Sequence, residues 1–452
     1  MSEKCFVLWH HSCSGVIFFA FFHTMRIRRR KDGTAMKRCS GCLVLILLLL
    51  WSFFSKYQCL ESCTDAIKQK PDLMVTSSPV PEAALPYTKN TGDVAAKKEL
   101  SLYAKSAVLM DAKSLRTLYE KEADEVLPMA STTKIMTCLM ALSYGNPDDV
   151  VTISSRAASQ PKVRLGVKEK EQYRLGDLLY ALMLESDNDA AVAIAEHVGG
   201  SVEAFCAQMT SRAHDMGLSH TSFVTPNGLD ADGHHTTARE LAMLGAYAIR
   251  QKGFLEIVNT KSYTITECTT NRTHHVSNKN AFLTMYPGAI GIKTGYTSKA
   301  SYCFVGAVQQ NDTTLVSAVL ASGWYPKKTY KWQDTKKLMD YGVKEYVPVA
   351  LLHPAVLSKT LPVTGGVKDQ IHVKEQESLT VLLKKEDQVS YAIQQEKPLL
   401  APLKKGELAA FLVISINGRV FHKVPLYTAE NVKRYDFSWC LRVLGKRFLL
   451  NG

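Results

Sequence analysis

Two residues in this sequence form a pair that could carry out acyl transfer. Ser131 stands three residues before Lys134, and an apolar run with helical periodicity follows directly. A helix that begins at Ser131 would place both side chains on one face. A serine hydroxyl is a weak nucleophile until a nearby base accepts its proton. The helix N-terminus would also offer free backbone N–H groups to a developing oxyanion. The pair therefore predicts Ser131 as nucleophile and Lys134 as its base.

Two further sets of residues could contribute polar groups to a substrate-binding cleft. Ser186 and Asn188 interrupt two helical patterns and have apolar residues on either side, so a polar loop there could point into a cleft. Lys293, Thr294 and Gly295 precede a strand pattern. They offer a cation, a hydroxyl and close backbone approach to a substrate carboxylate. A second lysine would also lower the pKa of Lys134 and make it a better base.

The first two patterns are weak alone, because the sequence contains a second copy of each, whereas the third occurs once. Ser159 and Lys162 repeat the first spacing, but Pro161 biases Gln160 away from helical geometry and no apolar helix follows. Asn417 repeats the second pattern with Ser415, where a hairpin turn explains it. We interpret both second copies as coincidental.

Together the first three groups resemble a known set. They occur in order, 55 and then 107 residues apart, as in the penicillin-recognising serine enzymes. The stretches LESDNDAA (184–191), TPNGLD (225–230) and APLKKG (401–406) are similar to low-molecular-mass penicillin-binding proteins that act as serine D-Ala-D-Ala carboxypeptidases. The resemblance covers roughly residues 98–450.

The resemblance implies a role for each motif residue. Ser131 becomes the acyl-ester nucleophile, Lys134 its proton acceptor and Ser186 a proton relay. Asn188 would contact the substrate peptide, and the remaining groups would bind its carboxylate and one edge, namely Lys293, Thr294, Gly295 and Tyr296. The backbone N–H groups of Ser131 and Tyr296 are the expected oxyanion donors. The substrate would be the peptidoglycan stem peptide, β-lactams would be covalent inhibitors, and neither a cofactor nor a metal is implied.

Three alternatives remain at this point. A D,D-endopeptidase or transpeptidase would use the same residues, and a penicillin-acylated sensor would differ only in turnover. A class A β-lactamase deacylates with a glutamate in a Glu-x-x-x-Asn loop, whereas residues 219–228 contain no acidic residue. A β-lactamase also has no use for the C-terminal β domain and anchor described below.

The elements that must position the motifs predict an α+β domain over 98–345. Strand patterns occur at 106–110 and 115–121, and again at 301–308 and 314–321. Helical patterns lie between them and after them, at 132–143, 175–184, 190–197, 202–216, 237–250 and 327–341. Strands at both ends of the block predict an antiparallel sheet with helices packed on it, which is the transpeptidase/β-lactamase-like fold that the resemblance implies. Cys138 and Cys206 fall on apolar helical positions and are expected in the core.

The C-terminal part changes its period. From 346 to 428 the pattern alternates, and Asn417-Gly418 joins runs at 410–416 and 420–426, which predicts a small all-β domain. Residues 429–452 follow, where Phe437, Leu441, Leu444 and Phe448 form an apolar stripe beside basic residues. We interpret this segment as an amphipathic helix anchored at the membrane surface, with packing on the β domain as the alternative.

The N-terminal region reads as a targeting segment, residues 1–63, with a linker at 64–97. Lys37-Arg38 precede an apolar run of about fourteen residues, which has the length of a signal-peptide core. Translation could start at Met25 or Met36, and Cys63 is a weak candidate for lipidation. We therefore expect export to the outer face of the cytoplasmic membrane, in the cell envelope.

The net charge of +13 does not indicate nucleic-acid binding. Residues 1–70 hold eleven Lys/Arg against four Asp/Glu, and residues 430–452 hold five against two. The folded body is therefore close to balanced, and no nucleic-acid partner is expected.

Overall fold

The fold is built around one antiparallel sheet. The structure is a computed structural model and describes residues 100–352, 360–375 and 378–450, so the targeting region and linker expected at 1–97 lie outside it. Five strands pair in the order β2-β1-β9-β8-β7. Their bounds are β1 Ser106–Asp111, β2 Thr117–Lys121, β7 Ala289–Thr297, β8 Ser301–Gln310 and β9 Thr313–Leu320. Every neighbouring pair is antiparallel. The strand order makes β7 one of the two edge strands.

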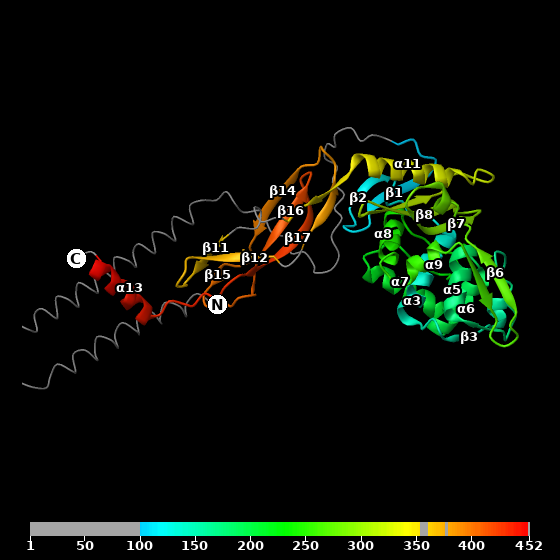
Figure 1. Cartoon of the computed structure of the whole chain (residues 1–452), viewed down its shortest axis with the longest axis horizontal. Helices are drawn as coiled ribbons and strands as arrows, with labels where there is room; N and C mark the ends of the chain where they lie inside the picture. The colour runs from blue at the N-terminus through cyan, green and yellow to red at the C-terminus, as the bar shows by residue number, and fades with distance from the viewer. Residues whose placement is uncertain (1–99, 353–359, 376–377, 451–452) are drawn as a thin grey trace, which may run out of the picture. The chain divides into compact units, whose positions relative to one another are not determined.

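Alternate residues of this sheet enter two different cores, because side chains of a strand point to opposite faces. Val305 and Ala307 of β8 belong to the larger core, which the helices on one face complete. Phe304 and Val308 belong to a second core on the other face. There they pack with α11 (Tyr330–Glu345), which runs along that face in Figure 1. The sheet is therefore covered on both sides, as expected for an α+β domain.

The helices occupy most of the predicted stretches. They are α3 Lys134–Tyr144, α4 Ser155–Ala158, α5 Leu175–Tyr180, α6 Asn188–Gly199, α7 Val202–Asp215, α8 Ala238–Ala248, α9 Phe254–Asn259 and α10 Phe282–Met285. Two short irregular helices adjoin them, the 3₁₀ turn η1 (Ala130–Thr133) and the π-helical turn η2 (Ala181–Glu185). Cys138 and Cys206 are both buried, as predicted.

Two short hairpins were not predicted from the sequence. One pairs β3 (Val150–Thr152) with β4 (Gln172–Arg174), and the other pairs β5 (Ser262–Thr266) with β6 (Thr273–Ser277). In β5 only Ile265 is fully buried. Strands this short and this exposed carry almost none of the apolar alternation that predicts a strand.

The C-terminal strands have a core of their own. Six of them pair in the order β14-β16-β17-β12-β11-β15, and β10 pairs with β13. Their bounds are β10 Val347–Ala350, β11 Thr360–Thr364, β12 Gln370–Lys374, β13 Thr380–Leu383, β14 Val389–Gln394, β15 Leu399–Leu400, β16 Leu408–Ile416 and β17 Arg419–Thr428. Asn417 and Gly418 both have positive φ between β16 and β17, as a type I′ turn requires. The predicted hairpin is therefore confirmed.

The last element is α13 (Phe437–Leu450), so the helix begins eight residues after the start of the segment 429–452 that was expected to form it. Val432 is instead held in a β-bridge with Leu403. Phe437 and Leu441 are exposed. None of the helices in the described ranges is both long enough and apolar enough to cross a bilayer.

Candidate active site

Ser131 lies in η1, not in the first turn of the α-helix itself. Ala130 before it has a left-handed backbone with φ of 49°, which is uncommon for a residue with a side chain. The helix α3 begins only at Lys134. The prediction that both residues share one face holds, because Lys134 Nζ lies 3.1 Å from Ser131 Oγ.

Lys134 has a set of contacts that fits a neutral amine. Its side chain is completely buried, and its nitrogen lies 2.9 Å from Asn188 Oδ1 and 2.6 Å from the carbonyl oxygen of Asn227. A neutral amine has two hydrogens and one lone pair. The two oxygens can accept the two hydrogens, which leaves the lone pair for the hydroxyl proton of Ser131.

The electrostatic surroundings favour that neutral form. Burial lowers the pKa of Lys134 well below its usual value, and the charge of Lys293 lowers it further, while Asp187 and Asp189 act in the opposite direction. A base with a lowered pKa is available at neutral pH. The expected effect of a second lysine on the first is therefore present.

The loop between η2 and α6 supplies the second motif. Ser186 has a left-handed backbone with φ of 75°, and α6 begins at Asn188. Asn188 donates through Nδ2 to the carbonyl oxygen of Pro161, which fixes its Oδ1 toward Lys134. The hydroxyl of Ser186 is buried and has no hydrogen-bond partner. In this structure the hydroxyl of Ser186 is therefore not hydrogen-bonded to either Lys134 or Lys293.

Asp187, in the middle of this motif, was not selected from the sequence. It is fully buried and neither carboxylate oxygen has a hydrogen-bond partner. Burial, together with the neighbouring charges of Asp189 and Glu185, raises the pKa of Asp187 to about 8, against the opposing effect of Lys134. A buried carboxyl without donors is most stable when it is protonated.

The third motif lies on the edge strand β7. Lys293 is buried, and its pKa is lowered to about 7 mainly by that burial. Thr294 is half-buried and Tyr296 is exposed. A Cβ on Gly295 would stand 3.0 Å from the backbone nitrogen of Ser131, so only glycine allows this approach without displacement. β7 therefore brings the third motif against the nucleophile.

A fourth segment, residues 225–230, completes the site and was noticed in the sequence only as part of the resemblance. The carbonyl oxygen of Asn227 accepts from Lys134 and lies 3.4 Å from Ser131 Oγ. Gly228 packs so closely that a Cβ there would stand 2.1 Å from the carbonyl oxygen of Ala130. A Pro-Asn-Gly sequence indicates a turn, but nothing local shows that the turn touches Ser131.

The second Ser-x-x-Lys copy also lies beside the site, though its own side chains take no part. Ser159 Oγ donates to the carbonyl of Arg156, and Lys162 is exposed. The neighbouring backbone matters instead, since Pro161 orients Asn188. Asn227 Nδ2 also donates to Gln160 Oε1 at 3.1 Å.

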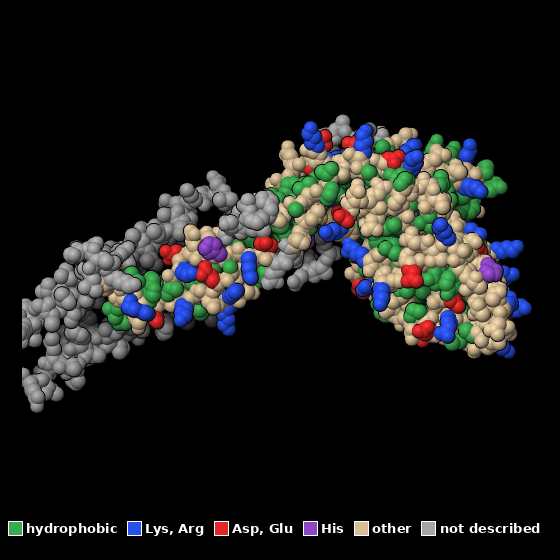
Figure 2. Space-filling view, viewed as in Figure 1, with side chains coloured by type: hydrophobic (Ala, Val, Ile, Leu, Met, Phe, Trp, Pro, Cys, Tyr) green, Lys and Arg blue, Asp and Glu red, His purple; other side chains and the backbone are tan. Residues whose placement is uncertain are grey.

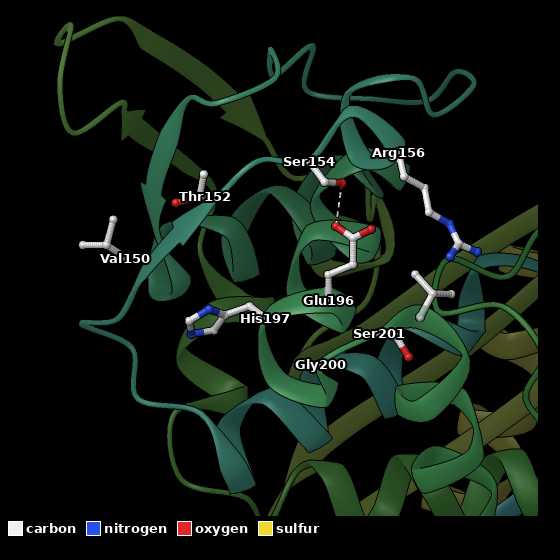
Figure 3. Close-up of a pocket in the computed structure, with 9 residues that line it drawn as sticks. Val150, Thr152, Ser154, Arg156, Glu196, His197, Gly200 and Ser201 are labelled. Atoms are coloured by element: carbon white, nitrogen blue, oxygen red, sulfur yellow. Dashed lines mark hydrogen bonds between the residues drawn. The ribbon is translucent and has the colours of Figure 1, made fainter.

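A pocket elsewhere in the domain contains none of these residues. It has a volume of about 440 Å³ and lies between β3 and the ends of α6 and α7. Its charged and imidazole side chains have partners: His197 lies 3.3 Å from Asp149 Oδ2, and Figure 3 shows Ser154 beside Glu196, whose oxygens lie 2.6 Å apart. Arg156 is bonded to Glu203. The ionisable side chains that line this pocket are therefore all paired.

The surface agrees with the balanced charge of the folded body. The face drawn in Figure 2 mixes Lys and Arg with Asp and Glu over the residues of the α+β domain. Such a surface has no extended basic stripe of the kind that binds nucleic acid on this face.

Comparisons with known proteins agree on one family. The family model described as D-alanyl-D-alanine carboxypeptidase matches residues 93–323. The model described as the C-terminal domain of penicillin-binding protein 5 matches residues 328–434.

Similar individual proteins carry these names or that of a DD-transpeptidase. The chain is 30% identical over 352 residues to D-alanyl-D-alanine carboxypeptidase DacF of Bacillus subtilis, covering 76% of this chain and 90% of that one. It is also 30% identical to DacC of Escherichia coli, over 75% and 86%. Among solved structures, penicillin-binding protein 5 of Haemophilus influenzae aligns with a TM-score of 0.65 at 27% identity, over 75% of this chain and all of the other. A Streptomyces DD-transpeptidase variant aligns with a TM-score of 0.52 at 31% identity, over 54% and 99%.

Proposed function

This chain belongs to the D-alanyl-D-alanine carboxypeptidase family of penicillin-binding serine peptidases, and on that premise we propose that it removes the terminal D-alanine from peptidoglycan stem peptides through an acyl-enzyme. One observation carries the proposal. A buried lysine with a lowered pKa lies 3.1 Å from a serine hydroxyl, with its two hydrogens directed to other acceptors.

The first step is acylation of Ser131. Its Oγ attacks the carbonyl carbon of the penultimate D-alanine while Lys134 accepts the proton. The backbone N–H groups of Ser131 and Tyr296 donate to the oxyanion that forms. The lysine of the third motif, Lys293, is the cation for the terminal carboxylate, and Thr294 is the hydroxyl beside it.

The second half of the reaction releases both products. The C–N bond breaks as the leaving amine of D-alanine receives a proton from Lys134. Ser186 relays this proton after the bound substrate has oriented its hydroxyl. Water then attacks the ester carbonyl, Lys134 acts again as base, and the shortened peptide departs. With a β-lactam, the bond that breaks lies in a ring, so the leaving group stays attached and the ester persists.

The chain's location and domain plan extend this proposal. We assign residues 98–345 to the peptidase domain and 346–428 to the β domain, and we assign the helix α13 within 429–452 to the membrane surface. The exposed apolar residues of α13 support the anchor. The apolar run after Lys37-Arg38 supports export to the outer face of the cytoplasmic membrane.

The test uses the full chain and a Ser131→Ala variant. We expect the unmutated protein to release D-alanine from a D-Ala-D-Ala peptide and to be labelled by fluorescent penicillin, and the variant to do neither. Labelling without release would indicate a sensor or an enzyme with another acceptor. Release that persists in the variant would remove Ser131 from the mechanism.

A further inference from the structure

A buried histidine next to the nucleophile has no role in the reaction described above. His234 is only 6% exposed, and it lies 101 residues after Thr133 in the sequence. Its ring nitrogen Nε2 is 2.8 Å from the hydroxyl oxygen of Thr133, which is itself completely buried. Thr133 lies inside the Ser-x-x-Lys motif, two residues after Ser131.

The hydrogen-bond directions around His234 are fixed by its other nitrogen. The backbone N–H of Val224 donates to Nδ1 at 3.0 Å, and that of Thr225 lies within 3.4 Å of the same atom. A neutral imidazole that accepts at Nδ1 carries its proton on Nε2. Nε2–H therefore donates to Thr133. The ring is held neutral because burial, and to a lesser extent His235, lowers the pKa of His234 to about 4.

The chain of hydrogen bonds ends on the peptide group that joins Ala130 to Ser131. Thr133 Oγ1 donates its own hydrogen to the carbonyl oxygen of Ala130 at 2.8 Å. That carbonyl belongs to the same planar peptide unit as the N–H of Ser131, which the proposed mechanism uses as an oxyanion donor. In a trans peptide the C=O and the N–H point in opposite directions. A hydrogen bond accepted at the oxygen therefore polarises the unit and strengthens donation from its nitrogen.

This peptide unit is also held in an unusual geometry. Ala130 has a φ of 49°, a conformation that is unfavourable for a non-glycine residue and persists only where the surroundings enforce it. Gly228 of the 225–230 loop and Gly295 of β7 contact the unit from two sides, as their close approaches to Ala130 and Ser131 indicate. The segment carrying His234 is tied to the same region, because Thr236 forms a two-way β-bridge with Leu127.

We propose that His234 and Thr133 form a hydrogen-bond relay that orients and polarises the Ala130–Ser131 peptide group as an oxyanion donor. The inference rests on the proposed function, since it assumes that Ser131 is the nucleophile. His234 is thus a positioning residue that acts through Thr133 and does not touch the substrate.

The test measures the oxyanion contribution directly. It compares acylation by an ester substrate ending in D-alanyl-D-lactate with acylation by its thionoester, in which sulfur replaces the attacked carbonyl oxygen. Sulfur is a poor hydrogen-bond acceptor, so an intact oxyanion hole favours the oxygen ester. The proteins are the full chain, Thr133→Val, His234→Ala, the double variant and His234→Gln. His235→Ala serves as a matched control.

If the relay is present, we expect three results from these variants. Thr133→Val and His234→Ala each slow acylation of the oxygen ester about tenfold, less than the loss of a direct donor, and shrink the oxygen-to-sulfur rate ratio. The double variant is no slower than the slower single variant, because both remove one relay. His234→Gln, whose amide nitrogen can donate to Thr133, retains most of the rate, and His235→Ala retains the ratio.

The outcomes separate this inference from the proposed function. Equal slowing of both esters, with the ratio unchanged, would mean that His234 has only a structural role and would overturn the relay. Additive effects of the two single variants would do the same. If the unmutated protein were acylated at a residue other than Ser131, the proposed function itself would fail instead. Thermal unfolding of each variant checks that the compared proteins are folded.

Discussion

Two buried lysines in the site are held toward their uncharged forms, and they need opposite protonation states to work. Lys134 has to be neutral to accept the serine proton, whereas Lys293 has to be charged to bind a carboxylate. Burial lowers both pKa values, and that of Lys293 reaches about 7. Activity should therefore depend on pH through both residues.

We expect kcat/KM for D-alanine release to rise with pH as Lys134 loses its proton and to fall as Lys293 loses its own near pH 7. The kcat/KM profile reports the free enzyme, where no substrate carboxylate stabilises the charge. In Lys293→Arg the guanidinium stays protonated, so the alkaline limb should move up by about one pH unit or more. An alkaline limb at the same pH in both proteins would mean that another group controls it.

The buried carboxyl of Asp187 should reduce stability as pH rises. Its pKa of about 8 lies above the value of 3.8 that an unfolded chain has. Between these values the unfolded chain releases a proton that the folded protein keeps, so folding becomes less favourable with each pH unit. The penalty is absent well below pH 4 and complete above pH 8.

Asp187→Asn removes that penalty and should raise the unfolding temperature. We expect a small gain at pH 5 and a gain on the order of 5 °C at pH 8.5. The control is Asp148→Asn, because Asp148 is an exposed aspartate. A gain that is equal at the two pH values would show that the carboxyl is not protonated in the folded protein.

At the scale of elements, the site depends on segments that approach one another closely. β7, η1, the η2–α6 loop and the 225–230 loop all meet at Ser131 and Lys134. Gly228 shows how little space remains, because a Cβ would overlap the carbonyl oxygen of Ala130. Gly228 also has a φ of 83°, so any other residue adds backbone strain.

We therefore expect Gly228→Ala to slow fluorescent-penicillin labelling at least about tenfold, because the new methyl group displaces the turn that carries Ser131. Gly200→Ala is the matched control. Gly200 has a φ of 77° but no atom within 4 Å of its Cβ position, so it adds the same strain without the collision. Similar labelling by the two variants would show that strain, not contact, is responsible for the effect.

At the scale of the whole molecule, two cores serve the α+β domain and a separate one serves the C-terminal strands. Beyond them, α13 carries the exposed apolar residues Phe437 and Leu441, on which the proposal of a membrane-surface helix rests. This exposure is what a helix lying in a membrane interface needs.

The full chain should therefore cosediment with vesicles that contain anionic lipid, and a Phe437→Asp/Leu441→Asp variant should remain largely in the supernatant. D-alanine release from a soluble peptide should be unaffected, since neither residue takes part in the reaction at Ser131. Val420→Asp is the control, because Val420 is an equally exposed apolar residue outside the helix. Equal sedimentation of the two variants would contradict the anchor.

The sequence by itself determined the type of chemistry and the class of fold. Ser131 and Lys134 are three residues apart, so local helical geometry was enough to predict that their side chains meet. Alternating and helical periodicities were likewise enough to predict an α+β domain and the β16–β17 hairpin, because these patterns arise from neighbouring residues.

Only the tertiary structure decided what surrounds that pair. Asn227 is 93 residues from Lys134 and His234 is 101 from Thr133, and no local pattern links residues so far apart. The unpartnered carboxyl of Asp187 and the lowered pKa of Lys293 also depend on burial, which is produced when distant segments pack together. The nucleophile and its base were therefore readable from spacing, whereas their orientation and protonation were set by long-range packing.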